Sequence, residues 1–342
     1  MRLIMNGSGW DIHLRTGSRT STGQVRENNE DSLHLWEAPS FVLAVVADGM
    51  GGAAAGEEAS RIAVEAVEDG LIALEPDSET LRNLSEELIV QKLRDAIRRG
   101  NLNIVRRAAI DPEMRGMGTT VTLAFVRDMH AIVAHVGDSR AYLVDSGTRD
   151  ITQITDDHSL VEALVAAGHL THEQAEEHPL RNVLYRALGQ NEDVDVDVYE
   201  AHLRLGDRLV LCSDGLTRHV KPHEIAEIVL AERDPEHASQ SLIDLANDRG
   251  GEDNVSVIII AVEGSLPENV KMKLEKIIID PDDTIDLRVR PLVSEEVGEP
   301  VLPSDSDTPV NHLYDDAPTI PFDTPYRREC ADEGRDIRVP EQ

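Results

Sequence analysis

Four aspartates stand at the ends of strongly apolar segments, each beside a small or flexible residue. They are Asp48 in FVLAVVADGMGG, Asp138 in HAIVAHVGDS, Asp214 in DRLVLCSDG and Asp253 in GGEDNVSVIII. Carboxylates rarely lie against a buried core without compensation, and only Asp138 has a close basic neighbour in the sequence, Arg140. Mg²⁺ and Mn²⁺ prefer oxygen ligands. One such motif alone is more often a simple turn, but the recurrence predicts a metal centre.

Glycines surround the first of these acids. Gly49 follows Asp48 and lets the backbone approach an ion, so its carbonyl oxygen is a further candidate ligand. Gly51 and Gly52 permit conformations that other residues avoid and keep bulk away from an ion. The acid is therefore expected at the end of a rigid strand with bare backbone beyond it.

The segments next to these acids have the composition of strands. Glu30 and Asp31, in the acidic cluster RENNEDS, begin one such segment. The segment 193–203 alternates strictly between polar and apolar residues and predicts a strand with one solvated face. The other predicted strands are 41–47, 119–126, 130–137, 140–145, 207–213 and 254–262.

Helices are predicted between the strands. Ser78 is the expected N-cap of a long helix over 78–109. The others cover 56–75, 223–232 and 235–250. Hairpin-connected strands with helices in blocks indicate an α+β domain, in which helices cover antiparallel sheets.

Composition limits the classes of partner. The chain has 342 residues, 40% of them hydrophobic, and a net charge of −32, which disfavours nucleic acid and acidic lipid surfaces. No run approaches the roughly 20 apolar residues of a membrane helix, and the start lacks a signal-peptide pattern. Cys212 and Cys330 form no disulfide framework, so the cytoplasm is the expected compartment.

The composition changes near Gly264. Beyond it the chain holds ten of its sixteen prolines, acids outnumber bases, and no periodicity is sustained. These features predict a largely disordered acidic tail over 264–342, with a linker or solubility role favoured over partner motifs. The predicted organisation is an extension over 1–12, one domain over 13–263, and this tail.

Eight motifs in order resemble those of the bacterial branch of the metal-dependent PP2C-type serine/threonine phosphatases. They are RENNED, ADGMGG, GMGTT, VGDSRAY, TDDHS, HPLRNVLYRALG, LCSDGL and GGEDNVSV. The resemblance covers about residues 13–263. It implies two packed antiparallel β-sheets flanked by helices, in four αββα layers, with a dinuclear Mn²⁺ or Mg²⁺ centre at one edge.

The resemblance also implies the metal ligands. Asp48 would bridge both metals, and the Gly49 carbonyl would bind one of them. Asp214 and Asp253 would complete the set. Asp138, together with Asp214, would hold a third, weaker metal.

Further roles follow for the RENNED motif. Glu30 would hold the site through a metal-bound water, with Asp31 as nearby support. Arg26 would bind the substrate phosphate, and its planar guanidinium suits two phosphate oxygens at once. A water shared by two cations is hydroxide-like at neutral pH and would attack phosphorus in line. No covalent intermediate is needed, so Cys212 is expected to be an inert buried thiol.

The general acid is left open. Eukaryotic members commonly have a histidine at the position of Met50, and that histidine is assigned the protonation of the leaving alcohol. Bacterial relatives often carry methionine there. A water on the third metal and His158 are the two candidates, and a structural role is the favoured interpretation of His158. Residues 159–188 resemble the family's variable flap beside the active site.

The expected function is hydrolysis of phosphoserine and phosphothreonine on proteins, opposing a bacterial serine/threonine protein kinase, by a monomer. A phosphorylated regulator of a sigma-factor switch is an alternative substrate. Two other classes are a catalytically inactive relative that binds a partner and a non-catalytic acidic metal-binding domain. The presence of Asp48, Asp214 and Asp253 argues against the first, and Arg26 argues against both.

Overall fold

The computed structural model describes residues 11–39, 41–72, 81 and 83–265. The tail over 266–342, the predicted N-cap Ser78 and Cys330 lie outside the described residues. Among the helices of the described residues, none combines the length and apolar character needed to cross a membrane.

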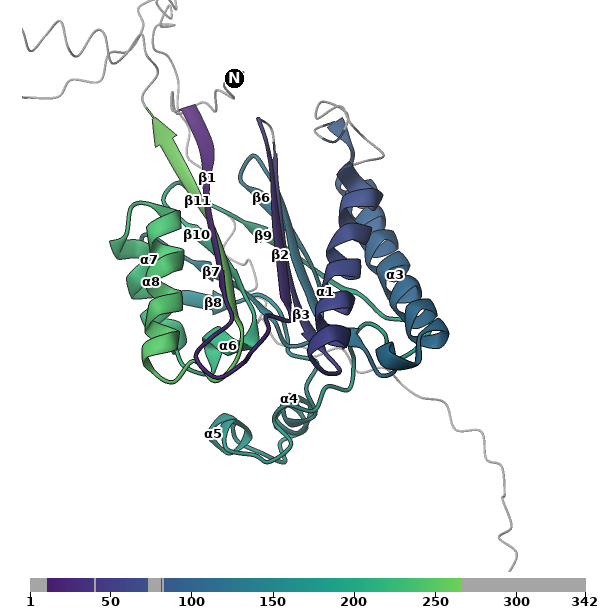
Figure 1. Ribbon diagram of the computed structural model, residues 1–342. Coiled ribbons are helices and arrows are strands. Elements are labelled where there is room, and N and C mark those ends of the chain that lie inside the picture. The colour runs from purple at the N-terminus through teal and green to yellow at the C-terminus, as the bar shows by residue number, and fades with distance from the viewer. Residues whose placement is uncertain (1–10, 40, 73–80, 82, 266–342) are drawn as a thin grey trace, which may run out of the picture. The chain divides into compact units, whose positions relative to one another are not determined.

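The strands form two antiparallel sheets, as predicted (Figure 1). One has the order β1 (Asp11–Ser21), β11 (Val255–Ser265), β10 (Arg208–Cys212), β7 (Arg140–Val144) and β8 (Ile151–Gln153). The other has the order β2 (Asp31–Ala38), β3 (Phe41–Met50), β5 (Val121–Arg127), β6 (His130–Val136) and β9 (Asp197–His202), and β4 (Gly118–Thr119) pairs with β3.

Helices cover the outer face of each sheet (Figure 1). The β3 sheet is covered by α1 (Ala53–Val67), which continues into the π-helical turn η1 (Glu68–Ile72), and by α3 (Glu86–Ile110). The β10 sheet is covered by α6 (Asp214–Thr217), α7 (Pro222–Ala231) and α8 (Pro235–Asp248). The remaining helical segments are η2 (Pro112–Met114), α4 (Leu160–Ala166) and α5 (His172–Glu176).

The uninterrupted apolar run of β3 results from burial on both faces. Val42, Ala44 and Val46 pack between the two sheets. Leu43 and Val45 point the other way and pack under α1 and α3. Because successive side chains of a strand alternate between faces, a strand in the middle of four layers must be apolar throughout.

Several predicted elements differ from the structure. Of the predicted strand 193–203, only 197–202 pairs with β6, although Val194 and Val196 are buried as the alternation requires. Helix α3 begins at Glu86, where the Ser85 side chain accepts a hydrogen bond from the Leu88 backbone N–H.

Sequence patterns did not indicate β1, β8, α4, α5 or α6. Four of these elements are short, with three to seven residues each, which is too few to establish a period. The fifth, β1, reads DIHLRTGSRTS and has few apolar residues. It is a strand because it pairs with β11 along its full length.

Candidate metal centre

Antiparallel pairing places the predicted acids at one edge of the two sheets. Asp31 begins β2 directly opposite Asp48 near the end of β3. In the other sheet β10 ends just before Asp214, and its partner β11 begins just after Asp253. Asp138 follows the end of β6. The edge is the lower one in Figure 1, where α6 lies.

Two threonines of the GMGTT motif fix the backbone of Asp48. The Asp48 carbonyl accepts hydrogen bonds from Thr119 Oγ1 at 2.8 Å and from the Thr120 backbone N–H at 2.9 Å. The Asp48 N–H donates to Thr120 Oγ1 at 3.0 Å. Thr120 Oγ1 also lies 2.7 Å from Ser139 Oγ, in the turn that carries Asp138. Buried hydroxyls therefore hold two of the predicted acids in a fixed relation.

Glycines allow Glu30 to approach the centre. A Cβ atom on Gly49 would lie 2.2 Å from the Gly56 carbonyl oxygen and 2.5 Å from that of Glu30. A Cβ on Gly56 would lie 1.9 Å from Glu30 Oε2. The start of α1, the end of β3 and Glu30 thus pack without side chains between them. Gly51 and Gly52 adopt φ values of +116° and +95°, as predicted from their type.

Asn254 and Ser213 connect the RENNED loop to the other sheet. Asn254 Nδ2 donates to the Thr22 and Asn28 carbonyls, and Asn254 Oδ1 accepts from the Glu30 N–H at 2.7 Å. Ser213 Oγ donates to Asp31 Oδ2 at 2.8 Å. These contacts link segments more than 180 residues apart, so no local sequence pattern indicated them.

The gathered carboxylates disfavour one another's ionisation. Burial raises the pKa of Asp48 well above its usual value, and Asp31, Asp214, Asp138 and Asp253 raise it further. Burial likewise raises the pKa of Asp31 to about 7 and that of Asp138 to about 8, with Asp214 adding to both shifts. The pKa of Glu30 is also raised, chiefly by burial. The site is therefore short of positive charge.

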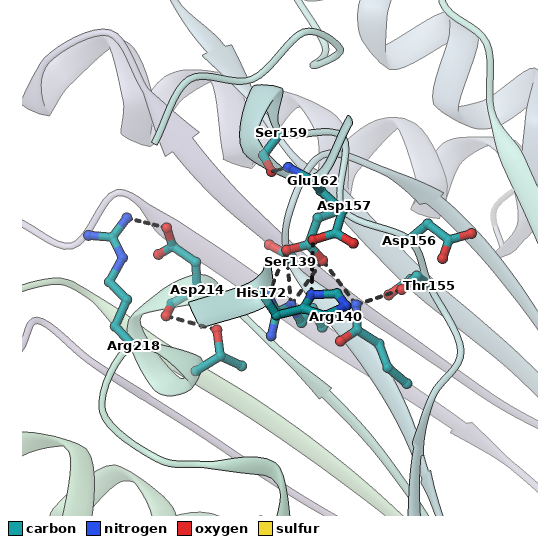
Figure 2. A network of polar contacts seen from close by, with 12 residues as sticks. Ser139, Arg140, Thr155, Asp156, Asp157, Ser159, Glu162, His172, Asp214 and Arg218 are labelled. Atoms are coloured by element: carbon teal, nitrogen blue, oxygen red, sulfur yellow. Dashed lines mark hydrogen bonds and ion pairs between the residues drawn. The ribbon is translucent and has the colours of Figure 1, made fainter. Parts of the chain in front are cut away.

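Two arginines lie among the carboxylates. Arg26 Nη2 donates to Asp253 Oδ2 at 3.0 Å, so the predicted phosphate-binding residue lies beside the predicted ligands. Arg218, which sequence reasoning missed, contacts Asp214 (Figure 2) and also contacts Asp253. The signal was its place four residues after Asp214, one helical turn away.

The arginine nearest Asp138 in the sequence has another partner. Arg140 is held by Asp157 of the TDDHS motif, with Nη2 and Nε at 2.7 and 2.9 Å from its carboxylate oxygens (Figure 2). Arg140 lowers the pKa of Asp138 only as a minor contribution, after burial and the neighbouring acids. Proximity in the sequence therefore pointed to the wrong cation.

The donor set fits a hard divalent cation. Asp31 Oδ1 and Asp214 Oδ1 are buried and have no hydrogen-bond partner among the residues that the structure describes. Buried polar atoms are normally paired, so each of these oxygens calls for a ligand. Carboxylate and carbonyl oxygens are the ligands that Mg²⁺ and Mn²⁺ take.

His158 is used structurally. Its Nδ1 accepts the Gly137 backbone N–H at 3.0 Å, and its Nε2 lies 3.0 Å from Asp197 Oδ2. Burial lowers the pKa of His158, which is almost wholly inaccessible to solvent. Cys212 is also buried, and burial raises the pKa of its thiol to about 12. Neither group is placed to act on a substrate.

A second group of possible metal ligands lies at the opposite end of β6. Glu86, His130 and Glu200 each offer an atom, and these atoms lie within 4.8 Å of one another. His130 Nδ1 contacts Glu86 Oε1 at 3.0 Å, and both glutamates are exposed. His130 begins β6, whereas Asp138 follows its end, so this cluster is separate from the centre.

Comparisons with known proteins agree with the geometry. The model of the family described as protein phosphatase 2C matches residues 20–245. The serine/threonine phosphatase stp of Listeria welshimeri is 38% identical over 243 residues, which are 71% of this chain and 93% of that protein. The serine/threonine protein phosphatase PstP of Mycobacterium tuberculosis is 40% identical over 249 residues, 73% of this chain and 45% of that protein.

A solved structure shows a metal centre in this fold. The catalytic domain of PstP in complex with two manganese ions superposes with a TM-score of 0.62 at 36% identity. The match covers 74% of this chain and 99% of that one.

Proposed function

The chain belongs to the protein phosphatase 2C family and is a metal-dependent serine/threonine phosphatase. From this premise we propose which role each residue of the site has in the reaction. The observation that carries the proposal is the convergence of Asp31, Asp48, Asp138, Asp214 and Asp253 at one sheet edge, where each of the other four raises the pKa of Asp48. Such a cluster is a site for multivalent cations rather than a stable set of bare anions.

Asp48, Asp214, Asp253 and the Gly49 carbonyl would hold two Mn²⁺ or Mg²⁺ ions. Asp138, near Asp214, would contribute to a third and weaker position. When bound, the ions supply Lewis acidity and a water of lowered pKa for hydrolysis. The chain's part is to keep these oxygens fixed, which the buried hydroxyls around Asp48 support.

Glu30 and Asp31 would support the centre from the RENNED loop. The Glu30 backbone is tied to Asn254, and its carboxylate lies in the space that Gly56 leaves. The Asp31 carboxylate is oriented by Ser213 Oγ. The Glu30 backbone and the Asp31 carboxylate are thus held at this edge of the sheets.

Arg26 would bind the substrate phosphate. Its side chain is 48% exposed and contacts Asp253, so it reaches from solvent to the edge of the carboxylate cluster. A guanidinium there can engage two phosphate oxygens and stabilise the charge of the transition state. Met50 cannot donate a proton and His158 is enclosed, so the proton for the leaving alcohol comes from neither of them.

The substrates are phosphorylated proteins, and we propose that they include a serine/threonine protein kinase and its targets. A monomeric state and a cytoplasmic location stay predictions from the sequence. The inactive partner-binding alternative is not supported, because the named relatives are phosphatases and the predicted ligands all lie together.

The direct test is phosphate release from a phosphothreonine peptide by wild type and Asp214→Asn, with Mn²⁺ and with excess EDTA. We expect turnover only for wild type with Mn²⁺. Arg26→Ala is expected mainly to raise KM, since ground-state phosphate binding is lost together with some transition-state stabilisation. Unchanged KM and kcat would refute the role of Arg26. No turnover by folded wild type with Mn²⁺ bound would refute the proposed function.

A further inference from the structure

Arg218 occupies a position that no motif predicted. It follows α6 directly, and its place four residues after Asp214 turns its side chain back onto that acid. Arg218 Nη2 contacts Asp214 Oδ2, and Nη1 donates to Asp253 Oδ2 at 2.9 Å. One guanidinium therefore joins two predicted metal ligands that are 39 residues apart in the chain, and Figure 2 shows its contact with Asp214.

The charge of Arg218 acts on several acids of the cluster. Burial lowers its pKa, but the pairs with Asp214 and Asp253 and the field of Asp48 raise it more, so the group stays charged. Arg218 in turn lowers the pKa of Asp138. Its side chain is only 28% exposed, so solvent screens these interactions weakly.

The oxygens that Arg218 uses are ones that a cation would need. Asp253 Oδ2 accepts from both Arg218 and Arg26, and Asp253 Oδ1 accepts from the Asn254 N–H at 3.0 Å. Asp214 Oδ2 is bound to Arg218, whereas Asp214 Oδ1 has no hydrogen-bond partner within the described part of the chain. A divalent ion could take Asp214 Oδ1 freely, but at Asp253 it must share or displace an arginine.

We propose that Arg218 is a tethered cation that competes with the divalent ions for Asp214 and Asp253. It stabilises the carboxylate cluster and so raises the metal concentration at which the centre fills. The inference rests on the proposed function only for the location of the metal centre. Removal of the guanidinium should then have two effects of opposite sign, weaker folding without metal and tighter binding of metal.

The test is calorimetric titration of Mn²⁺ into EDTA-treated, dialysed full-length protein. Arg218→Gln should bind Mn²⁺ at least about tenfold more tightly than wild type, equivalent to about 1.4 kcal/mol. The same variant should have a lower Tm than wild type in EDTA. Arg218→Lys keeps the positive charge and should lie closer to wild type in both measurements.

Arg61→Gln is the matched control. Arg61 on α1 also joins two carboxylates, Glu58 and Glu65, but is half-exposed and contacts none of the predicted ligands. The Arg61→Gln variant has the same change in net charge as Arg218→Gln, and its affinity for Mn²⁺ should match that of wild type. A tenfold gain in this control would attribute the effect to net charge and overturn the proposal.

Other outcomes are equally decisive. If Arg218→Gln binds Mn²⁺ with unchanged affinity, Arg218 does not compete with the ion for Asp214 and Asp253. If this variant binds Mn²⁺ more weakly, Arg218 supports the two ligands instead. If that variant does not fold, wild type labelled with ¹⁵N-arginine provides the test, with the signal assigned through Arg218→Lys. Mg²⁺ should shift the Arg218 Nε–H signal, and no shift at saturation would overturn the proposal. Failure of wild type to bind any Mn²⁺ would instead refute the proposed metal centre.

Discussion

Asp31 and Asp48 lie directly opposite each other in the antiparallel β2–β3 pair. After burial itself, the charge of Asp31 is the largest cause of the raised pKa of Asp48. Like charges directly opposite in a sheet are destabilising. The pair therefore costs folding free energy unless a cation lies between or beside the two acids, which makes it a sensitive point for testing the metal centre.

Asp31→Asn should stabilise the protein when metal is removed. The substitution removes a carboxyl group that folding must either protonate or leave charged opposite Asp48, and the amide oxygen can still accept from Ser213 Oγ. We expect Tm in EDTA to rise by about 2–4 °C, the shift that corresponds to about 1 kcal/mol in a domain of this size. Scanning calorimetry measures it, with the exposed Asp150→Asn as the control that leaves Tm unchanged. A lower Tm for Asp31→Asn would mean that the charge is compensated within the protein.

The pH dependence of stability should reveal the protonated carboxylates. Folding raises the pKa of Asp31 to about 7 and of Asp138 to about 8, chiefly through burial. The folded state then binds more protons than the unfolded state, so the unfolding free energy in EDTA should fall as the pH rises from about 6.5 to 8.

Two histidines define the lower limit of that window. Burial lowers the pKa of His135 to about 3 and also lowers that of His158. The pH dependence of their contribution to the unfolding free energy is opposite to that of the two acids. The histidine contribution is lost as the pH falls below the ordinary histidine pKa of 6.5. Urea titrations between pH 6.5 and 8 isolate the contribution of the acids to the unfolding free energy. The slope of this free energy against pH should be shallower in Asp138→Asn and should disappear when Mn²⁺ holds the carboxylates ionised. A stability in EDTA that rises with pH would contradict the assignment.

Thr120→Val should weaken both folding and turnover. The fully buried Thr120 hydroxyl accepts from the Asp48 N–H and pairs with Ser139 Oγ. Valine has nearly the same shape but leaves both groups unpaired, at a cost of about 1–3 kcal/mol. Urea unfolding measures the loss, and the exposed Thr152→Val is its control. If Thr120→Val kept wild-type stability and kcat, the hydroxyl would not be needed to position Asp48.

Gly56→Ala and Gly49→Ala should separate activity from stability. A Cβ on Gly56 meets the mobile end of the Glu30 side chain, whereas a Cβ on Gly49 meets only backbone atoms within 2.5 Å. We expect Gly56→Ala to fold normally and lose turnover as Glu30 is displaced. Gly49→Ala should lose about 1–3 kcal/mol of stability by overpacking. Circular dichroism and phosphate release distinguish them. Full activity of Gly56→Ala would contradict the proposed role of Glu30 in the site.

The sequence by itself determined the chemistry and the kind of element that carries it. The apolar run before Asp48 and the glycines after it specify a buried strand that ends on an acid, because both signals are local. The same is true of Asp138, Asp214 and Asp253, each beside its own apolar segment. The motif series around them sufficed to identify the family and the two-sheet fold.

Only the tertiary structure decided which groups meet. The position of Asp31 opposite Asp48 depends on strand register, and the approach of Arg218 to Asp253 depends on the β10–β11 pairing and the turn of α6. Sequence neighbours suggested Arg140 as a counter-charge, but Asp157 holds it. Electrostatic interactions act through space over several ångströms, whereas sequence patterns record only neighbours along the chain. The charge balance of the centre therefore became visible only in the fold.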